Sequence, residues 1–114
     1  MNNALITDEQ RIVLLANGRE SLENPDFDPA PVVKLLTPDA GATWLLTEID
    51  PDDHDHAFGL CDLGLGMPEI GWVSPQELAA VRGRLGLPVE RDLHFRAEKR
   101  LSAYARDAAG RIIE

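Results

Sequence analysis

Residues 42–74 alternate short apolar runs with turn signals, and this pattern constrains the fold more than any other part of the chain. The runs at 43–49 and 57–63 are rich in Trp, Leu, Ile, Phe and Thr, which suit a pleated, half-buried surface. The acidic segment 50–55, DPDDHD, lies between them, and its proline and aspartates predict an exposed hairpin tip. After GLGMP breaks the second run, residues 69–73 resume as a strand. The pattern therefore predicts three successive antiparallel strands.

The flanking sequence predicts one or two further strands. Residues 32–36 have the composition of a strand, and a turn at 37–41 leads from it into the central stretch. Residues 89–95 alternate apolar and polar side chains, as a short edge strand or an extended segment does. The expected sheet is a meander of four to five strands.

Helix signals lie on both sides of the strands. Thr7 and Gln10 form a capping box that starts a helix, which either ends at residues 17–18 or continues beyond them. The sequence SPQE at 74–77 starts a second helix, which is expected to end at Gly86.

A third helix is predicted at 101–109, with Gly110 as its end. At 114 residues the chain has the length of one compact domain. We therefore predict a single α+β domain over residues 1–114, in which two to three helices pack mainly on one face of an antiparallel sheet.

The formal net charge is −9, and the surplus of acid lies in the first half of the chain. Residues 1–62 carry 3 Lys and Arg against 13 Asp and Glu, a balance of −10, whereas residues 63–114 carry 8 against 7, a balance of +1. Direct binding to nucleic acid is not expected, because it depends on neutralising phosphates with Lys and Arg. The acidic half suits a basic partner surface; the alternative is that its charge only keeps the protein in solution.

Cys61 is the one cysteine of the chain. A single thiol forms no internal disulfide, and its place in an apolar strand predicts a small, buried side chain in a reducing compartment. The N-terminus lacks the pattern of a secretory leader, and no run of about 18 apolar residues could span a membrane. We expect a cytoplasmic protein without a cofactor.

Side chains alternate between the two faces of a strand. In the strand predicted at 43–49, one face therefore carries Trp44, Leu46 and Glu48. In the strand predicted at 57–63, one face carries Phe58, Leu60 and Asp62. If the hairpin pairs these sets, Glu48 and Asp62 share an otherwise apolar surface, where desolvation disfavours the charged form. Together with Glu69 they are the candidate catalytic residues of a small acid/base enzyme, with or without a divalent metal. The alternative is a structural carboxylate at the sheet margin, bonded to a loop or to an arginine.

The acidic turn collects six side chains that can bind metals: Asp50, Asp52, Asp53, His54, Asp55 and His56. It lacks the glycine at position six and the closing glutamate of a calcium-binding EF-hand loop. Imidazole binds Ni²⁺, Zn²⁺ or Cu²⁺ adventitiously, so His54, His56 and Asp53 would be the ligands of any metal held here. The expected state is a solvated turn without a metal, in which the four aspartates are the candidate partner-binding residues.

Three stretches of the chain are distinctive: KLLTPDAGATWLLTEIDPDD from Lys34, FGLCDLGLGMPEIGWVS from Phe58 and GLPVERDLHF from Gly86. Together they resemble the bacterial family catalogued as DUF2958. The family pattern includes acids that match Glu48, Asp62, Glu69 and the triplet Glu90-Arg91-Asp92. The resemblance implies no activity and no catalytic residues, because none is assigned to the family. It implies an accessory protein of plasmids or integrated mobile elements, with a role in conjugation, anti-defence or element maintenance.

The leading hypothesis is a non-enzymatic module that binds a basic partner through its acidic half. In a sharper form of this hypothesis, its carboxylates take the place of nucleic-acid phosphates and so inhibit a host defence protein that binds nucleic acid. The alternative is the small carboxylate enzyme. Arg91 is expected to form an ion-pair latch between the sheet and the preceding helix. An exposed Trp44 or Trp72 would mark a dimer or partner surface.

Overall fold

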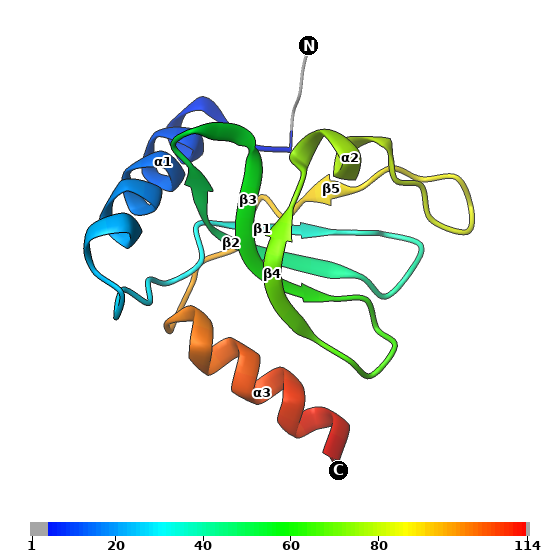
Figure 1. The fold of residues 1–114 in the computed structure, drawn as a ribbon. Coiled ribbons are helices and arrows are strands. Elements are labelled where there is room, and N and C mark those ends of the chain that lie inside the picture. The colour runs from blue at the N-terminus through cyan, green and yellow to red at the C-terminus, as the bar shows by residue number, and fades with distance from the viewer. Residues whose placement is uncertain (1–4, 114) are drawn as a thin grey trace.

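One antiparallel sheet of five strands and three helices make up the fold, which the computed structural model describes for residues 5–113 (Figure 1). The strand order is β4-β3-β2-β1-β5. The first four strands form the predicted meander, and β5 pairs with the other side of β1, so the predicted α+β class is confirmed. In chain order the elements are α1 (Asp8–Glu23), β1 (Val33–Leu36), β2 (Thr43–Asp50), β3 (Asp53–Asp62), β4 (Glu69–Val73), α2 (Pro75–Ala80), β5 (Glu90–Arg91) and α3 (Leu101–Ile113).

Helix α1 begins where the capping box predicts. The Thr7 side chain accepts a hydrogen bond from the Gln10 backbone N–H (3.0 Å), and the Gln10 side chain accepts one from the Thr7 backbone N–H (2.9 Å). The helix continues through Gly18, which lies against β2. A Cβ atom at Gly18 would lie 2.0 Å from the backbone oxygen of Ile49. This glycine therefore lets the helix approach the strand closely.

A β-bulge in β2 decides which side chains share a face of the sheet. Before the bulge Trp44 is opposite Cys61, and after it Glu48 is opposite Phe58. The one extra residue in β2 turns the side chains that follow to the other face. The predicted pairing is therefore wrong for Trp44 and Leu46, which lie on the opposite face from Phe58, whereas Glu48 shares the face of Phe58.

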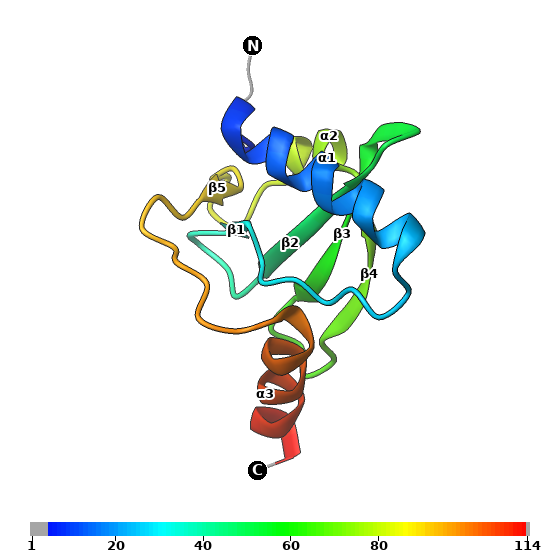
Figure 2. The same cartoon turned by 90° about the vertical axis from the view of Figure 1, so that its left-hand side faces the viewer.

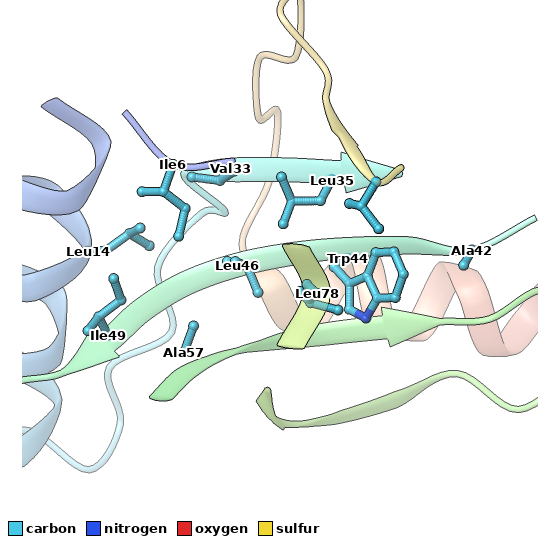
Figure 3. Packing of buried hydrophobic residues seen from close by; sticks show 11 residues of the cluster. Ile6, Leu14, Val33, Leu35, Ala42, Trp44, Leu46, Ile49, Ala57 and Leu78 are labelled. Carbon is cyan, nitrogen blue, oxygen red and sulfur yellow. The ribbon is translucent and has the colours of Figure 1, made fainter. Parts of the chain in front are cut away.

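The larger cluster of buried side chains lies on the face of the sheet that α1 and α2 cover (Figure 3). It joins Leu14 of α1 and Leu78 of α2 to strand residues such as Trp44, Leu46 and Ile49. Burial of these side chains supplies the main hydrophobic stabilisation of the domain.

The smaller cluster lies on the opposite face, where α3 packs. Leu101 and Ala108 of α3 contact Leu45 of β2 and Leu60 of β3. Figure 2 shows α1 and α2 on one side of the sheet and α3 on the other. Two of the three helices thus share a face, and the third covers part of the second face.

Helix α2 ends at Ala80, well before the predicted end at Gly86, and this boundary prediction is wrong. Val81 has extended backbone angles (φ −72°, ψ 140°). The loop that follows is held by Asp39, whose carboxylate accepts hydrogen bonds from the backbone N–H groups of Leu85 (2.6 Å) and Leu87 (3.3 Å). The Asp39 carboxylate thus accepts from loop N–H groups that would bond within the helix if α2 continued to Gly86.

Helix α3 continues through Gly110 to Ile113, so the predicted end at Gly110 is also wrong. A glycine inside a helix costs only about 1 kcal/mol relative to alanine, which a packed helix tolerates. The start of α3 is tied to the connector that follows α1: the Leu101 N–H donates to the Pro29 carbonyl (3.0 Å) and the Ser102 N–H to the Asp28 carboxylate (3.2 Å). Among residues 5–113, no helix has the length and apolar character needed to cross a membrane.

Candidate functional site

The acidic hairpin between β2 and β3 is the first candidate site. Its turn contains only Pro51 and Asp52, because β2 reaches Asp50 and β3 begins at Asp53, so the tip is shorter than the predicted segment 50–55. Asp50 Oδ1 accepts a hydrogen bond from the Asp52 N–H (2.8 Å), and Asp53 Oδ1 accepts one from the Asp55 N–H (3.1 Å). Aspartate side chains thus satisfy the turn backbone, which lets few residues close the hairpin.

The carboxylates at this hairpin have no basic partner in the part of the chain that the structure describes. Asp52 and Asp53 are exposed, and no Lys or Arg nitrogen there lies within 4.0 Å of any of the four aspartates at 50, 52, 53 and 55. The His56 ring lies beside the turn, with its Nδ1 3.7 Å from Asp50 Oδ2. The turn therefore presents negative charge to solvent without an internal counter-ion.

Asp55 differs from the other three aspartates, because it holds the start of α2. Its Oδ1 accepts a hydrogen bond from the Gln76 backbone N–H (2.9 Å), and its Oδ2 accepts one from the Ser74 hydroxyl. Ser74 is itself the N-cap residue, and its hydroxyl oxygen accepts from the Glu77 N–H (3.1 Å). A carboxylate at a helix N-terminus is stabilised by the free N–H groups there, so Asp55 has a structural task.

Aromatic side chains lie directly beside the acidic turn. The Trp72 ring stacks against His56, with 4.5 Å between ring centroids, and packs against Phe58 at 5.1 Å. Trp72 remains 45% exposed, whereas Trp44 is buried at 5%. Of the two tryptophans, Trp72 is therefore the exposed one and Trp44 belongs to the core.

Glu48 is a buried carboxylate at the other side of the β2 bulge. It is 7% exposed, and burial raises its pKa above the ordinary value of 4.5. A hydrogen bond with the Ser21 side chain of α1 lowers the pKa, and the charge of Asp50 raises it further. The net direction follows from desolvation, which disfavours the charged form.

The three candidate catalytic carboxylates do not converge. Asp62 shares the sheet face of Glu48, but it pairs with Thr43. Glu48 pairs with Phe58, which lies four residues before Asp62 in β3. At ~3.3 Å per residue, the two carboxylates are therefore about 13 Å apart along the strand. Glu69 is opposite Cys61 and lies on the other face. The geometry thus separates the acid/base groups that the sequence suggested.

Asp62 instead borders a hollow of about 160 Å³ between the sheet and α3. Its polar lining comes from Lys34, Thr43, Asp62 and Tyr104, and its apolar lining includes Leu45 and Leu60. Asp62 also closes the β3–β4 loop, because its Oδ1 accepts from the Gly64 N–H (2.9 Å). Neither Glu48 nor Glu69 lines this hollow.

The predicted metal candidates are spread along the start of β3. His54 and Asp53 are exposed, and His56 lies against Trp72 and Asp50. Within residues 5–113, no three His, Cys, Asp or Glu side chains are placed so that together they could hold a metal ion.

The triplet at 90–92 connects β5 to β1. Asp92 donates its backbone N–H to the Lys34 carbonyl (2.9 Å), and its carboxylate lies 3.8 Å from the Lys34 ammonium. Asp92 thus ties the end of β5 to β1, and the ion-pair latch expected of Arg91 stays a prediction.

Sequence reasoning missed the roles of three aspartates, Asp28, Asp39 and Asp55, each of which binds backbone N–H groups far away along the chain. No local pattern marks such long-range contacts. The exposed apolar side chains of β4 could be recognised from the sequence. Ile70 and Trp72 are two residues apart in an edge strand and therefore share one face.

A search of curated proteins found no match, and neither did a search of solved structures. One comparison was positive. The family model described as "Protein of unknown function (DUF2958)" matches residues 5–113, so the chain belongs to the DUF2958 family.

Proposed function

We propose that this protein is a small interaction module that binds a basic surface of a partner protein through its acidic hairpin. One observation carries the proposal: Asp50, Asp52 and Asp53 lie together on one turn and, among the described residues, no Lys or Arg neutralises them. Such a concentration of one charge attracts a complementary surface and accelerates encounter with it.

The neighbouring aromatic cluster supports the proposal. Protein interfaces combine aromatic anchors at their centre with a polar or charged rim. Trp72 offers a half-exposed ring at contact distance from His56, whose own imidazole lies beside Asp50. An apolar contact and negative charge are therefore available within one small area.

The sharper form of the proposal is that the carboxylates stand in for the phosphates of a nucleic acid and so occupy a nucleic-acid-binding partner. It draws on the net charge of −9. A protein of a plasmid or integrated element with this property would act against a host defence protein. Cytoplasmic location belongs to the same proposal.

A carboxylate enzyme is the weaker alternative, because Glu48, Asp62 and Glu69 do not face one another. Glu48→Gln and Asp62→Asn separate the two ideas. Under the interaction proposal both variants keep partner binding, since neither residue belongs to the acidic turn.

The test is affinity capture from a lysate of the cells that carry the protein, with charge-reversed bait. The variant Asp52→Lys/Asp53→Lys reverses the exposed turn and leaves Asp55 in place, because Asp55 holds α2. The control, Glu20→Lys/Glu23→Lys, makes the same charge change on the exposed side of α1. Mass spectrometry then compares the three captured sets.

We expect the wild type and the α1 control to capture one abundant partner. The turn variant should not capture it. Purified partner should then bind at least tenfold more weakly at about 0.5 M NaCl than at 0.1 M, because salt screens exposed charges. Equal capture by the turn variant would reject the proposal, as would binding that does not depend on salt.

A further inference from the structure

We propose that β4 is the interface of a symmetric dimer, in which β4 of one copy pairs antiparallel with β4 of a second copy. β4 is an edge strand whose one neighbour is β3. Outside the β3–β4 ladder, no backbone hydrogen bond found within residues 5–113 engages residues 69–73. The outer N–H and C=O groups of β4 are thus open to another strand.

β4 also carries few of the devices that normally protect an edge. Such devices are short strands, prolines, charged side chains and bulges. β4 has five residues in unbroken register with β3, and it contains no proline, lysine or arginine. Ile70 is 46% exposed and Trp72 is 45% exposed, both on the same face. An exposed apolar edge of this kind favours association.

The sequence of β4 is complementary to itself. If a two-fold axis passes through the paired Gly71 residues, Ile70 of each copy is opposite Trp72 of the other copy. Glu69 of each copy is likewise opposite Val73 of the other. Directly opposed side chains in an antiparallel pair interact, and aromatic–aliphatic pairs stabilise it. No like charges are opposed in this register.

A second copy fits this edge better than a basic peptide does. Glu69 is the one charged residue of β4, so the strand itself offers little to select a basic segment. Residues 63–73 are all exposed or half-exposed, so the edge is accessible to a second chain. Leu63, Leu65 and Met67 extend the apolar edge beyond β4.

Salt dependence distinguishes this dimer from the binding proposed for the acidic turn. Two copies that each carry −9 repel one another, and added salt screens that repulsion. Salt should therefore strengthen the dimer, whereas it should weaken binding to a basic partner. The dimer does not depend on the proposed function, and either can fail alone.

The experiment is sedimentation equilibrium of the full chain from about 5 to 500 μM at low and at about 0.5 M NaCl. We expect the mass to rise from 12.5 kDa toward twice that value with concentration, and the dissociation constant to fall at least threefold at the higher salt. A mass of one chain over the whole range would reject the dimer.

Charge pairs test the register. In the variant Ile70→Lys/Trp72→Lys both pairs formed by positions 70 and 72 oppose Lys with Lys. In Ile70→Glu/Trp72→Glu both oppose Glu with Glu. Each variant alone should be at least about tenfold weaker as a dimer, since its central anchors are lost. An equimolar mixture should form a 1:1 dimer. The control Ile12→Lys/Leu22→Lys changes exposed apolar residues of α1 and should dimerise as the wild type does.

Circular dichroism verifies that each variant folds. If a double variant does not, Trp72→Lys mixed with Ile70→Glu still opposes Lys with Glu once. Variants that dimerise alone as the wild type does would reject the interface. Folded variants whose mixture stays monomeric would reject the register and with it the proposal.

Discussion

The two faces of the sheet are covered to different degrees. Among the residues whose burial is described, the hydrophobic cluster on the face of α1 and α2 contains eleven buried residues, whereas the cluster on the face of α3 contains four. The first face holds the domain together. The second face leaves Trp72 and Ile70 half-exposed at the β4 edge. The two faces of one sheet thus differ in burial, and both proposals use the exposed Trp72 of the less covered face.

The difference in burial predicts a difference in stability. Leu46→Ala removes a side chain that is 1% exposed on the first face and should lower the free energy of unfolding by about 2–5 kcal/mol, through lost burial and a cavity. Ile70→Ala, on the second face, should lower it by less than about 1 kcal/mol in dilute protein. Urea denaturation followed by circular dichroism measures both. Equal losses would contradict the division between the faces.

A smaller effect is expected where α3 joins the second face. Asp28→Ala removes the carboxylate that accepts hydrogen bonds from the Ser102 N–H and hydroxyl, and the loss of such a cap costs about 1 kcal/mol. Hydrogen exchange in the first turn of α3 should accelerate. Asp26→Ala, at an exposed residue of the same connector, is the matched control. Similar exchange in both variants would mean that α3 is held by its apolar contacts alone.

Glu48 provides a pH-dependent test, because its charge is buried beside the bulge. Folding raises the pKa of Glu48. At a pH between the pKa of the unfolded chain and that of the folded chain, Glu48 is therefore protonated in the folded chain and ionised in the unfolded chain. Stability therefore falls as pH rises through that window, which begins near 4.5. Glu48→Gln, which keeps an acceptor for Ser21, should have the higher melting temperature at pH 7, and this advantage should vanish below pH 4.5. Asp52→Asn, at an exposed turn residue, should show no such change.

Local signals in the sequence were sufficient for the meander and for the helix starts. The capping box at Thr7 and the serine–proline start at 74–75 act within a few residues, and both are present in the structure. The turn signals at 37–41 and within the predicted tip 50–55, of which Pro51 and Asp52 form the turn, likewise separate strands that pair with their neighbours in sequence.

The parts that could not be predicted depend on contacts between distant residues. The bulge between Leu46 and Glu48 has no sequence signature, yet it decides which face Glu48 joins. The early end of α2 depends on Asp39, which is 46 residues from the backbone group that it binds. The candidate catalytic set failed to converge for another reason: Asp62 is four residues along β3 from the residue opposite Glu48, and Glu69 lies on the other face.

The smallest expected effect concerns Cys61, which is opposite Glu69 of β4. Burial raises the pKa of its thiol above 9.0, a hydrogen bond with Trp44 opposes this, and the charges of Glu69 and Asp62 raise it further. Because the thiolate is the reactive species, alkylation by iodoacetamide at pH 7.5 should be slower than in the urea-unfolded chain by about tenfold or more. Glu69→Gln removes one of the charges that raise the pKa and should accelerate the reaction slightly. A thiol that reacts equally fast in folded and unfolded protein would mean that the surroundings of Cys61 in the fold do not suppress its thiolate.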